Sequence, residues 1–183
     1  MENKLPRVTG ILQAEGFTDF SKVNPDIMAR AQNFGTALHS TTELWDKKIL
    51  KISTLDKELI PYLDGWIKFI KDYEIVIEPT EIENHLISTK WGFQGTPDRY
   101  PIIKGKRTII DLKSSTVMYP ATALQTAAYQ ILVEENTGFK VQQRWGIQLN
   151  EKGAYKIIPY SKASDRTVFL SALNTFKWKK ENL

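Results

Sequence analysis

Cysteine is absent from this chain of 183 residues. Its absence excludes disulfide bonds, zinc sites built on thiolates, cysteine nucleophiles and iron–sulfur clusters held by cysteine. A chain without cysteine is compatible with a reducing compartment such as the cytoplasm.

The sequence also lacks any apolar run that approaches the roughly 18 residues needed to span a bilayer. Residues 1–10 carry charges but no hydrophobic segment of the kind found in a secretion signal. We therefore expect no membrane partner and a cytoplasmic location. Hydrophobic residues make up 42% of the chain, which suits one folded domain rather than a disordered chain.

The excess of positive charge is small. The formal net charge is +4 and the sequence pI is about 9.1. This bias fits a nucleic-acid-binding protein, because Lys and Arg contact phosphates, but it also fits many proteins with other functions. Composition therefore allows DNA as a partner without selecting it.

Hydrophobic periodicity and turn residues predict a mixed α/β chain. Helical patterns cover residues 24–45, 55–73, 121–135 and 161–180. Extended patterns cover residues 74–88, 92–103, 107–114, 141–149 and 154–159. Asn24 and Pro25 suit an N-cap and a first helical position, and Ser161 suits the N-cap of the last helix. We expect one domain with a mixed sheet flanked by helices, helical over about 1–73 and with its catalytic core over about 74–183.

A turn at Lys104 and Gly105 would set the register of the central hairpin. With a two-residue or a four-residue loop, Asp98 lies directly opposite Asp111, whereas a three-residue loop shifts the pairing by one. Opposed side chains share a face, with Cβ atoms roughly 4.5–5.5 Å apart. Two carboxylates so close need a cation or a proton between them, so one of the pair should have a raised pKa. Their repulsion also predicts that Asp98→Asn does not destabilise the metal-free protein.

Lys113 follows Asp111 by two residues, on the same face of the strand. Oxygen ligands without sulfur favour Mg²⁺ or Mn²⁺. A metal between acidic groups, together with a lysine that orients water and stabilises charge on a phosphate, is what phosphodiester hydrolysis requires. An isolated D-x-K pattern also arises by chance as ordinary surface charge, and the register alone leaves that alternative open.

Six short motifs, in order along nearly the whole chain, resemble the PD-(D/E)XK nuclease superfamily. Within it they resemble the RecB-like group, which includes phage exonucleases and the mitochondrial genome maintenance exonuclease. The motifs are VTGIL at 8–12, G-x-x-x-H at 35–39, an acidic residue at 83, G-x-x-D at 95–98, D-x-K-[ST] at 111–114 and Q-x-x-x-Y at 125–129. The lack of cysteine excludes the subgroup that carries an iron–sulfur cluster.

The resemblance implies an α/β restriction-endonuclease-like core with a central metal. The expected ligands are His39, Asp98, Asp111 and the backbone carbonyl of Leu112, with Mg²⁺ or Mn²⁺ as the ion. Lys113 would position or activate the nucleophilic water.

Three further residues belong to the expected site. Glu83 would help bind a second ion or orient the ligands, and Glu81 competes for this role because both are expected on one strand face. Gln125 and Tyr129 share a helix face, either near the DNA backbone or hydrogen-bonded within the site. The alternative is that both are polar groups at the rim of an apolar helix.

Gly35 and His39 share one face of a predicted helix. A glycine inside a helix needs a reason, and a close approach of the helix to the sheet is the expected one. Without the resemblance, a core histidine beside a packing glycine would be the simpler explanation. His85, the other histidine, is expected to be structural.

Aromatic and basic residues offer weaker signals. Trp91, next to Gly92 in a turn, is the best candidate among five tryptophans for stacking on a base, although most tryptophans are core residues. Two basic clusters could contact phosphates, and such clusters are usually solvated faces. Their members are Lys104, Lys106, Arg107, Lys177, Lys179 and Lys180.

The sequence therefore predicts a metal-dependent DNA nuclease. Exonuclease action and a role in DNA processing or recombination, in a phage for example, are implied by the resemblance alone. Two alternatives remain open: a non-catalytic nucleic-acid-binding protein with the same fold, and a sequence-specific endonuclease.

Overall fold

The computed structural model describes residues 5–19, 21, 23–115 and 117–183. Its five α-helices are α1 Val8–Ala14, α2 Pro25–Asp46, α3 Ile60–Asp72, α4 Ala121–Thr137 and α5 Ser164–Asn182. Its six strands are β1 Leu86–Ser88, β2 Phe93–Gly95, β3 Ile102–Ile103, β4 Lys106–Lys113, β5 Gln143–Leu149 and β6 Tyr155–Pro159. Short 3₁₀ turns cover Ile52–Thr54 and Pro79–Glu81. Within the described residues, no helix is long and apolar enough to cross a membrane.

Four strands form a mixed sheet in the order β3-β4-β5-β6. The β4 and β5 strands run parallel and are joined through α4, whereas the two outer pairs are antiparallel. A central strand with a parallel neighbour is covered on both faces, which is why β4 is buried without interruption from Thr108 to Leu112. The β1 and β2 strands form a separate two-stranded sheet.

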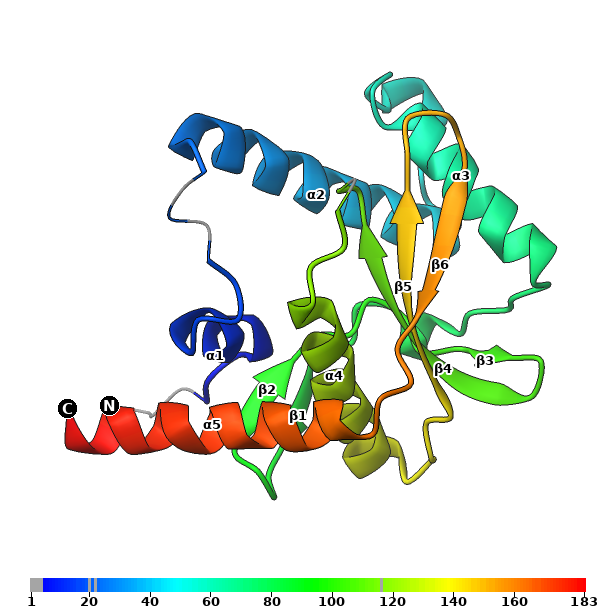
Figure 1. Ribbon diagram of the computed structural model, residues 1–183. Helices are drawn as coiled ribbons and strands as arrows, with labels where there is room; N and C mark the ends of the chain where they lie inside the picture. The colour runs from blue at the N-terminus through cyan, green and yellow to red at the C-terminus, as the bar shows by residue number, and fades with distance from the viewer. Residues whose placement is uncertain (1–4, 20, 22, 116) are drawn as a thin grey trace.

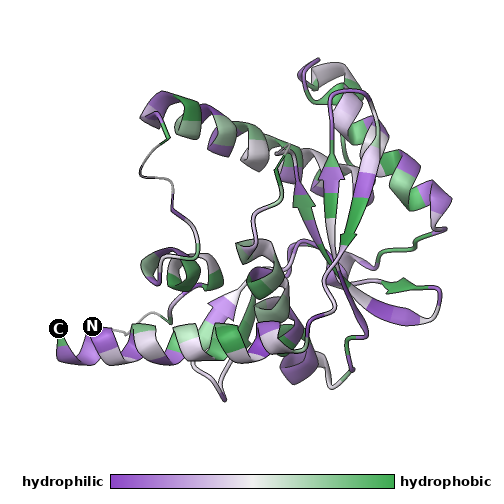
Figure 2. Cartoon of the chain, viewed as in Figure 1, coloured by the Kyte–Doolittle hydropathy of each residue, from purple (hydrophilic) through white to green (hydrophobic). Residues whose placement is uncertain are grey.

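Two hydrophobic cores lie on opposite faces of β4 (Figure 1). Ile109 packs with α1, α4 and α5 on one face. Ile110 and Leu112 pack with α2 and α3 on the other. Because side chains alternate along a strand, Asp111 and Lys113 share the face of Ile109, toward α4. Figure 2 shows hydrophobic residues in the middle of α5 and hydrophilic residues toward its C-terminal end.

The predicted register of the central hairpin is confirmed. Ile103 pairs with Lys106, and an isolated bridge joins Arg99 to Ile110, so the same register places Asp98 opposite Asp111. The single strand predicted over 92–103 is wrong: β2 pairs with β1, and only β3 and Arg99 pair with β4. Pro97 and Pro101 interrupt this segment because proline has no N–H to donate to the ladder.

Several predicted element boundaries also need correction. The segment 74–88 is extended only at Leu86–Ser88 and includes the 3₁₀ turn, and α3 begins at Ile60 rather than near residue 55. Ser161 does not cap the last helix, whose N-cap is Ala163. The predicted cap at Asn24 is confirmed, since its side chain accepts from the backbone N–H of Asp26. The β5–β6 hairpin is confirmed as well.

Candidate active site

Asp98 and Asp111 are both buried where the hairpin strands separate. Asp98 is 5% exposed and Asp111 is fully buried. The backbone N–H of Leu112 donates to Asp98 Oδ2 at 2.6 Å. The register that pairs Arg99 with Ile110 would pair Leu112 with Pro97, but the Leu112 N–H donates to the Asp98 side chain instead. The Asp98 carboxylate is thereby fixed beside β4.

His39 and Glu83 join Asp98 from two other segments. His39 Nδ1 lies 3.3 Å from Glu83 Oε1 and 3.4 Å from Asp98 Oδ1. One ligand atom from each of the three lies within 4.8 Å of the others, an arrangement that could hold a metal ion. Glu83 has a φ of 47°, a conformation that is uncommon outside glycine and is often found at functional sites.

Asp111 stands beside this group of three. Its Oδ2 lies 2.6 Å from Lys113 Nζ, but the contact lacks the geometry of a hydrogen bond. Among the described residues, neither Asp111 oxygen has a hydrogen-bond partner. A buried carboxylate without donors is costly, and a cation that bound there would satisfy both oxygens. The donor set of one imidazole and three carboxylates fits a hard divalent cation.

The pKa values of the two aspartates shift in opposite directions. Burial raises the pKa of Asp111 to about 6, with a further rise from Asp98 and an opposing effect of Lys113. Burial alone would also raise the pKa of Asp98, but the charges of His39 and Lys113 and the Leu112 N–H outweigh it and lower that pKa.

The two cations respond to the same carboxylates. The charge of Asp98 is the main cause that raises the pKa of His39 to about 10, with burial opposing it. Burial would lower the pKa of Lys113, but the charges of Asp111 and Asp98 outweigh it and raise the pKa. In the metal-free protein both groups therefore carry a proton at neutral pH.

Arg99 is a buried part of the site that sequence reasoning missed. Its side chain is fully buried, with Nε 2.7 Å from Asp46 Oδ2 and Nη1 3.3 Å from Glu83 Oε1. The guanidinium also lies 5.8 Å from the ring centre of Trp66, whose Nε1 donates to Asp46. Arg99 thus helps to fix the position of the Glu83 carboxylate. Its position next to Asp98 was the only signal in the sequence, and Asp46 and Trp66 are too distant in the chain to be inferred as its partners.

The two glutamates have different partners. Glu81 forms an ion pair with Arg107, away from the carboxylates. Glu83 contacts His39 and Arg99. The expectation that both lie on one strand face is wrong, because Glu81 ends a 3₁₀ turn and Glu83 has a left-handed backbone.

A cleft of about 930 Å³ opens onto this centre. Its walls come from α1, α2, the end of β4 and the N-terminal turn of α4. His39, Glu83, Leu112, Lys113 and Gln125 all line it. These five residues therefore face one accessible space, whereas the buried Asp98 and Asp111 are not part of its lining.

Gln125 and Tyr129 form a pair rather than two independent site groups. Gln125 reaches the cleft, and its Nε2 donates to the hydroxyl of Tyr129 at 2.9 Å. Tyr129 is 4% exposed, and burial with the charge of Asp111 raises its pKa well above the usual range. A Cβ on Gly95 would lie 3.0 Å from the Tyr129 ring, so this glycine permits α4 to pack closely.

The expectation that Gly35 allows α2 to approach the sheet closely is wrong. A Cβ built at Gly35 meets no heavy atom of the described residues within 4 Å. The glycine lines the cleft instead of packing on the sheet, one helical turn before His39. Since a helix-interior glycine costs about 1 kcal/mol relative to alanine, its presence is not explained by packing in the free protein.

The weaker candidates are engaged elsewhere. Trp91 packs half-buried against the core, with Lys90 Nζ 5.4 Å from its ring centre. Lys177 donates to the Trp91 carbonyl and Lys179 contacts Glu15. His85 lies 2.8 Å from Gln94 Oε1, consistent with a structural role.

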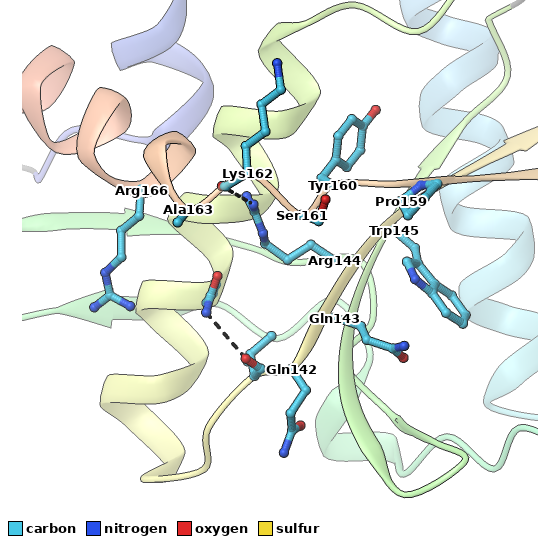
Figure 3. Close-up of a pocket in the computed structure, with 12 residues that line it drawn as sticks. Gln142, Gln143, Arg144, Trp145, Pro159, Tyr160, Ser161, Lys162, Ala163 and Arg166 are labelled. Carbon is cyan, nitrogen blue, oxygen red and sulfur yellow. Dashed lines mark hydrogen bonds between the residues drawn. The ribbon is translucent and has the colours of Figure 1, made fainter.

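A second pocket, of about 490 Å³, lies away from the carboxylates (Figure 3). It is bordered by β5 and by the segment between β6 and α5. Arg144 extends along it and donates to the Lys162 carbonyl at 3.0 Å and to Asp165 at 2.9 Å. Its most buried cation is thus already paired, and the pocket holds none of the acidic site residues.

Comparisons with known proteins agree with the fold. No protein-family profile and no curated protein matches the chain. Among solved structures, a putative exonuclease from Eubacterium rectale superposes with a TM-score of 0.53 at 13% identity, covering 79% of this chain and 65% of that one. This chain thus spans just under two thirds of that protein. An alkaline exonuclease from Laribacter hongkongensis gives a TM-score of 0.39 at 11% identity, covering 82% and 83%. The chain has an α/β restriction-endonuclease-like core, a mixed sheet flanked by helices.

Proposed function

We propose that this protein is a divalent-metal-dependent DNA nuclease, most simply an exonuclease of the RecB-like kind. The observation that supports it is the convergence of His39, Glu83 and Asp98 beside a buried Asp111, whose close partner Lys113 does not meet it in hydrogen-bond geometry. A pure binding protein has no need to bury such a carboxylate. The name of the similar structure from Eubacterium rectale points in the same direction.

In this proposal His39, Asp98 and Asp111 hold the ion, together with the Leu112 carbonyl. Glu83 completes the acidic centre or binds a second ion. A bound Mg²⁺ or Mn²⁺ supplies a Lewis acid and a water of lowered pKa. The remaining tasks fall to the side chains around it.

Lys113 faces the cleft and carries a proton at neutral pH in the metal-free protein. It therefore acts as a cationic hydrogen-bond donor, which can orient a water molecule and stabilise charge that develops on the scissile phosphate. Gln125 offers its amide to the substrate or to water, with its orientation fixed by Tyr129. Arg99 keeps the Glu83 carboxylate turned toward His39.

The test is a nuclease assay on end-labelled linear DNA with Mg²⁺, Mn²⁺ or EDTA. We expect cleavage with metal only, and loss of cleavage in Lys113→Ala. Turnover should fall by about 10²–10⁴-fold, while the metal-dependent rise in melting temperature is kept, because Lys113 is not a ligand. Lys71→Ala, on the far side of the sheet in α3, is the matched control. Cleavage that persists in EDTA would refute the metal-dependent mechanism.

A further inference from the structure

One stripe of α2 forms a wall of the cleft and includes His39 of the proposed metal centre. Gln32, Gly35, Thr36 and His39 all line the cleft, and their spacing places them along a single face of the helix. A ligand that lies along this wall of the cleft and reaches His39 therefore contacts Gly35 and Gln32 or their neighbours.

Gly35 is the anomaly in the stripe. It lies in the interior of α2, and its Cβ would meet only open space. Neither a positive φ nor a close packing contact requires glycine at this position. The free protein thus contains a gap on the wall of the cleft, one turn from a proposed ligand, that an alanine would narrow.

The cleft is lined by several neutral polar side chains and carries little positive charge. Among its described lining residues, Lys113 is the one lysine or arginine. Neutral side chains with N–H or O–H donors supply most of the polar lining, for example Thr9, Gln13, Gln32 and Ser115. In nucleic-acid complexes, both neutral groups of this kind and cations contact phosphate and sugar oxygens. Contacts from neutral groups release fewer counterions.

We infer that the sugar–phosphate backbone of the cleaved DNA strand lies against α2 at Gly35, with neutral donors such as Gln32 contacting its oxygens. Gly35 is then a specificity-determining residue that sets the clearance for the strand. The volume of about 930 Å³ is that of a pocket for a ligand of drug size, which corresponds to a short piece of one strand. This inference rests on the proposed nuclease function.

The experiment compares Gly35→Ala and Gly35→Leu with Asn33→Ala. Alanine and leucine are both strong helix formers, so the two Gly35 variants differ mainly in volume. Both should melt at or above the wild-type temperature and keep the metal-dependent rise. The KM for a labelled oligonucleotide should increase about tenfold in Gly35→Ala and more in Gly35→Leu. Asn33 is exposed on the same helix and does not line the cleft, so Asn33→Ala should leave KM unchanged.

The outcomes separate this inference from the function on which it rests. A wild-type protein that cleaves no DNA would remove the proposed function itself. An active wild type with an unchanged KM in Gly35→Leu would overturn the role of Gly35 alone. Equal losses in the alanine and leucine variants would show that flexibility, not clearance, is what the glycine supplies.

Salt dependence tests the neutral contacts. With one lysine at the cleft, log(1/KM) should fall against log salt with a slope near −1 or shallower, since each phosphate neutralised on a single strand contributes about −0.7. A slope several times steeper would show that cations outside the cleft hold the strand, and would overturn this part of the inference.

Discussion

Replacing Asp111 by asparagine should stabilise the metal-free protein, although it removes a site residue. The carboxylate is fully buried and neither of its oxygens accepts a hydrogen bond among the described residues. A pKa raised from 3.8 to about 6 corresponds to about 3 kcal/mol of destabilisation by the ionised form. Asparagine removes this destabilisation, but its buried amide has unsatisfied groups of its own, which would offset about 1–3 kcal/mol of the gain. The net gain should be about 0–2 kcal/mol, or a few degrees in melting temperature.

The sign of the pH dependence follows from the raised pKa. The folded state holds the Asp111 proton more tightly than the unfolded state, so this contribution to stability is complete below the unfolded pKa near 4 and is lost as pH rises through about 6. The advantage of Asp111→Asn in EDTA should therefore be present at about pH 8 and should vanish at about pH 4.

Asp98→Asn is the matched comparison, and we expect it to lower the stability of the metal-free protein. The pKa of Asp98 is lowered, mainly by His39 among the groups that oppose burial, so its ionised form stabilises the fold above that pKa. Loss of the charge leaves His39 without its principal partner. This reverses the expectation from sequence, which considered only the repulsion between the two aspartates.

Thermal melting of the three proteins, in EDTA and with Mg²⁺ or Mn²⁺, tests the argument. Metal should stabilise wild type by about 2.7 kcal/mol at a hundred times the dissociation constant, and both variants much less. If Asp111→Asn melts well below wild type in EDTA at about pH 8, the contact with Lys113 outweighs burial and the reasoning fails.

Three further results are expected. Metal binding at about pH 8 should release close to one proton, because the raised pKa of His39 keeps the imidazole protonated and a metal ligand must be neutral. Calorimetry in buffers of different ionisation enthalpy would measure the number of protons released. An equal release from His39→Ala would show that the proton comes from another group. In chemical denaturation, Arg99→Met should lower the free energy of unfolding by about 3–5 kcal/mol. Arg30→Met, which removes the exposed ion pair with Glu58, should lower it by at most about 1 kcal/mol. Linear DNA should be degraded faster than covalently closed circles, and equal rates on both would favour the endonuclease alternative.

The parts of the fold that the sequence predicted depend on short-range chemistry. The Lys104–Gly105 turn set the hairpin register, and Asn24 with Pro25 marked the start of α2. Contacts between distant segments were beyond this reasoning. The β2 strand pairs with β1 rather than with β4, and α1 forms a helix on the core although only a motif was noted there. Local patterns specify a strand but not its partner.

The same division applies to the candidate site. The register alone placed Asp98 opposite Asp111, and it predicted that one of the two has a raised pKa. It could not say which one, because the answer depends on His39 from α2 and on how deeply each carboxylate is buried. Arg99 was missed for the same reason: its partners come from α2 and from the segment before β1.

The charges at the centre explain how a metal-free fold can keep so many carboxylates together. Glu83, Asp98, Asp111 and Asp46, the second partner of Arg99, face three cations, namely a protonated His39, Lys113 and the buried Arg99. The cluster therefore has one negative charge in excess without a metal, and the pairing of the other charges limits the cost of burying it. Exchange of the His39 proton for a divalent ion would bring these groups to neutrality. The repulsion between the excess charge and a phosphodiester would then be removed, so the proposed nuclease centre would attract DNA more strongly when its metal is bound.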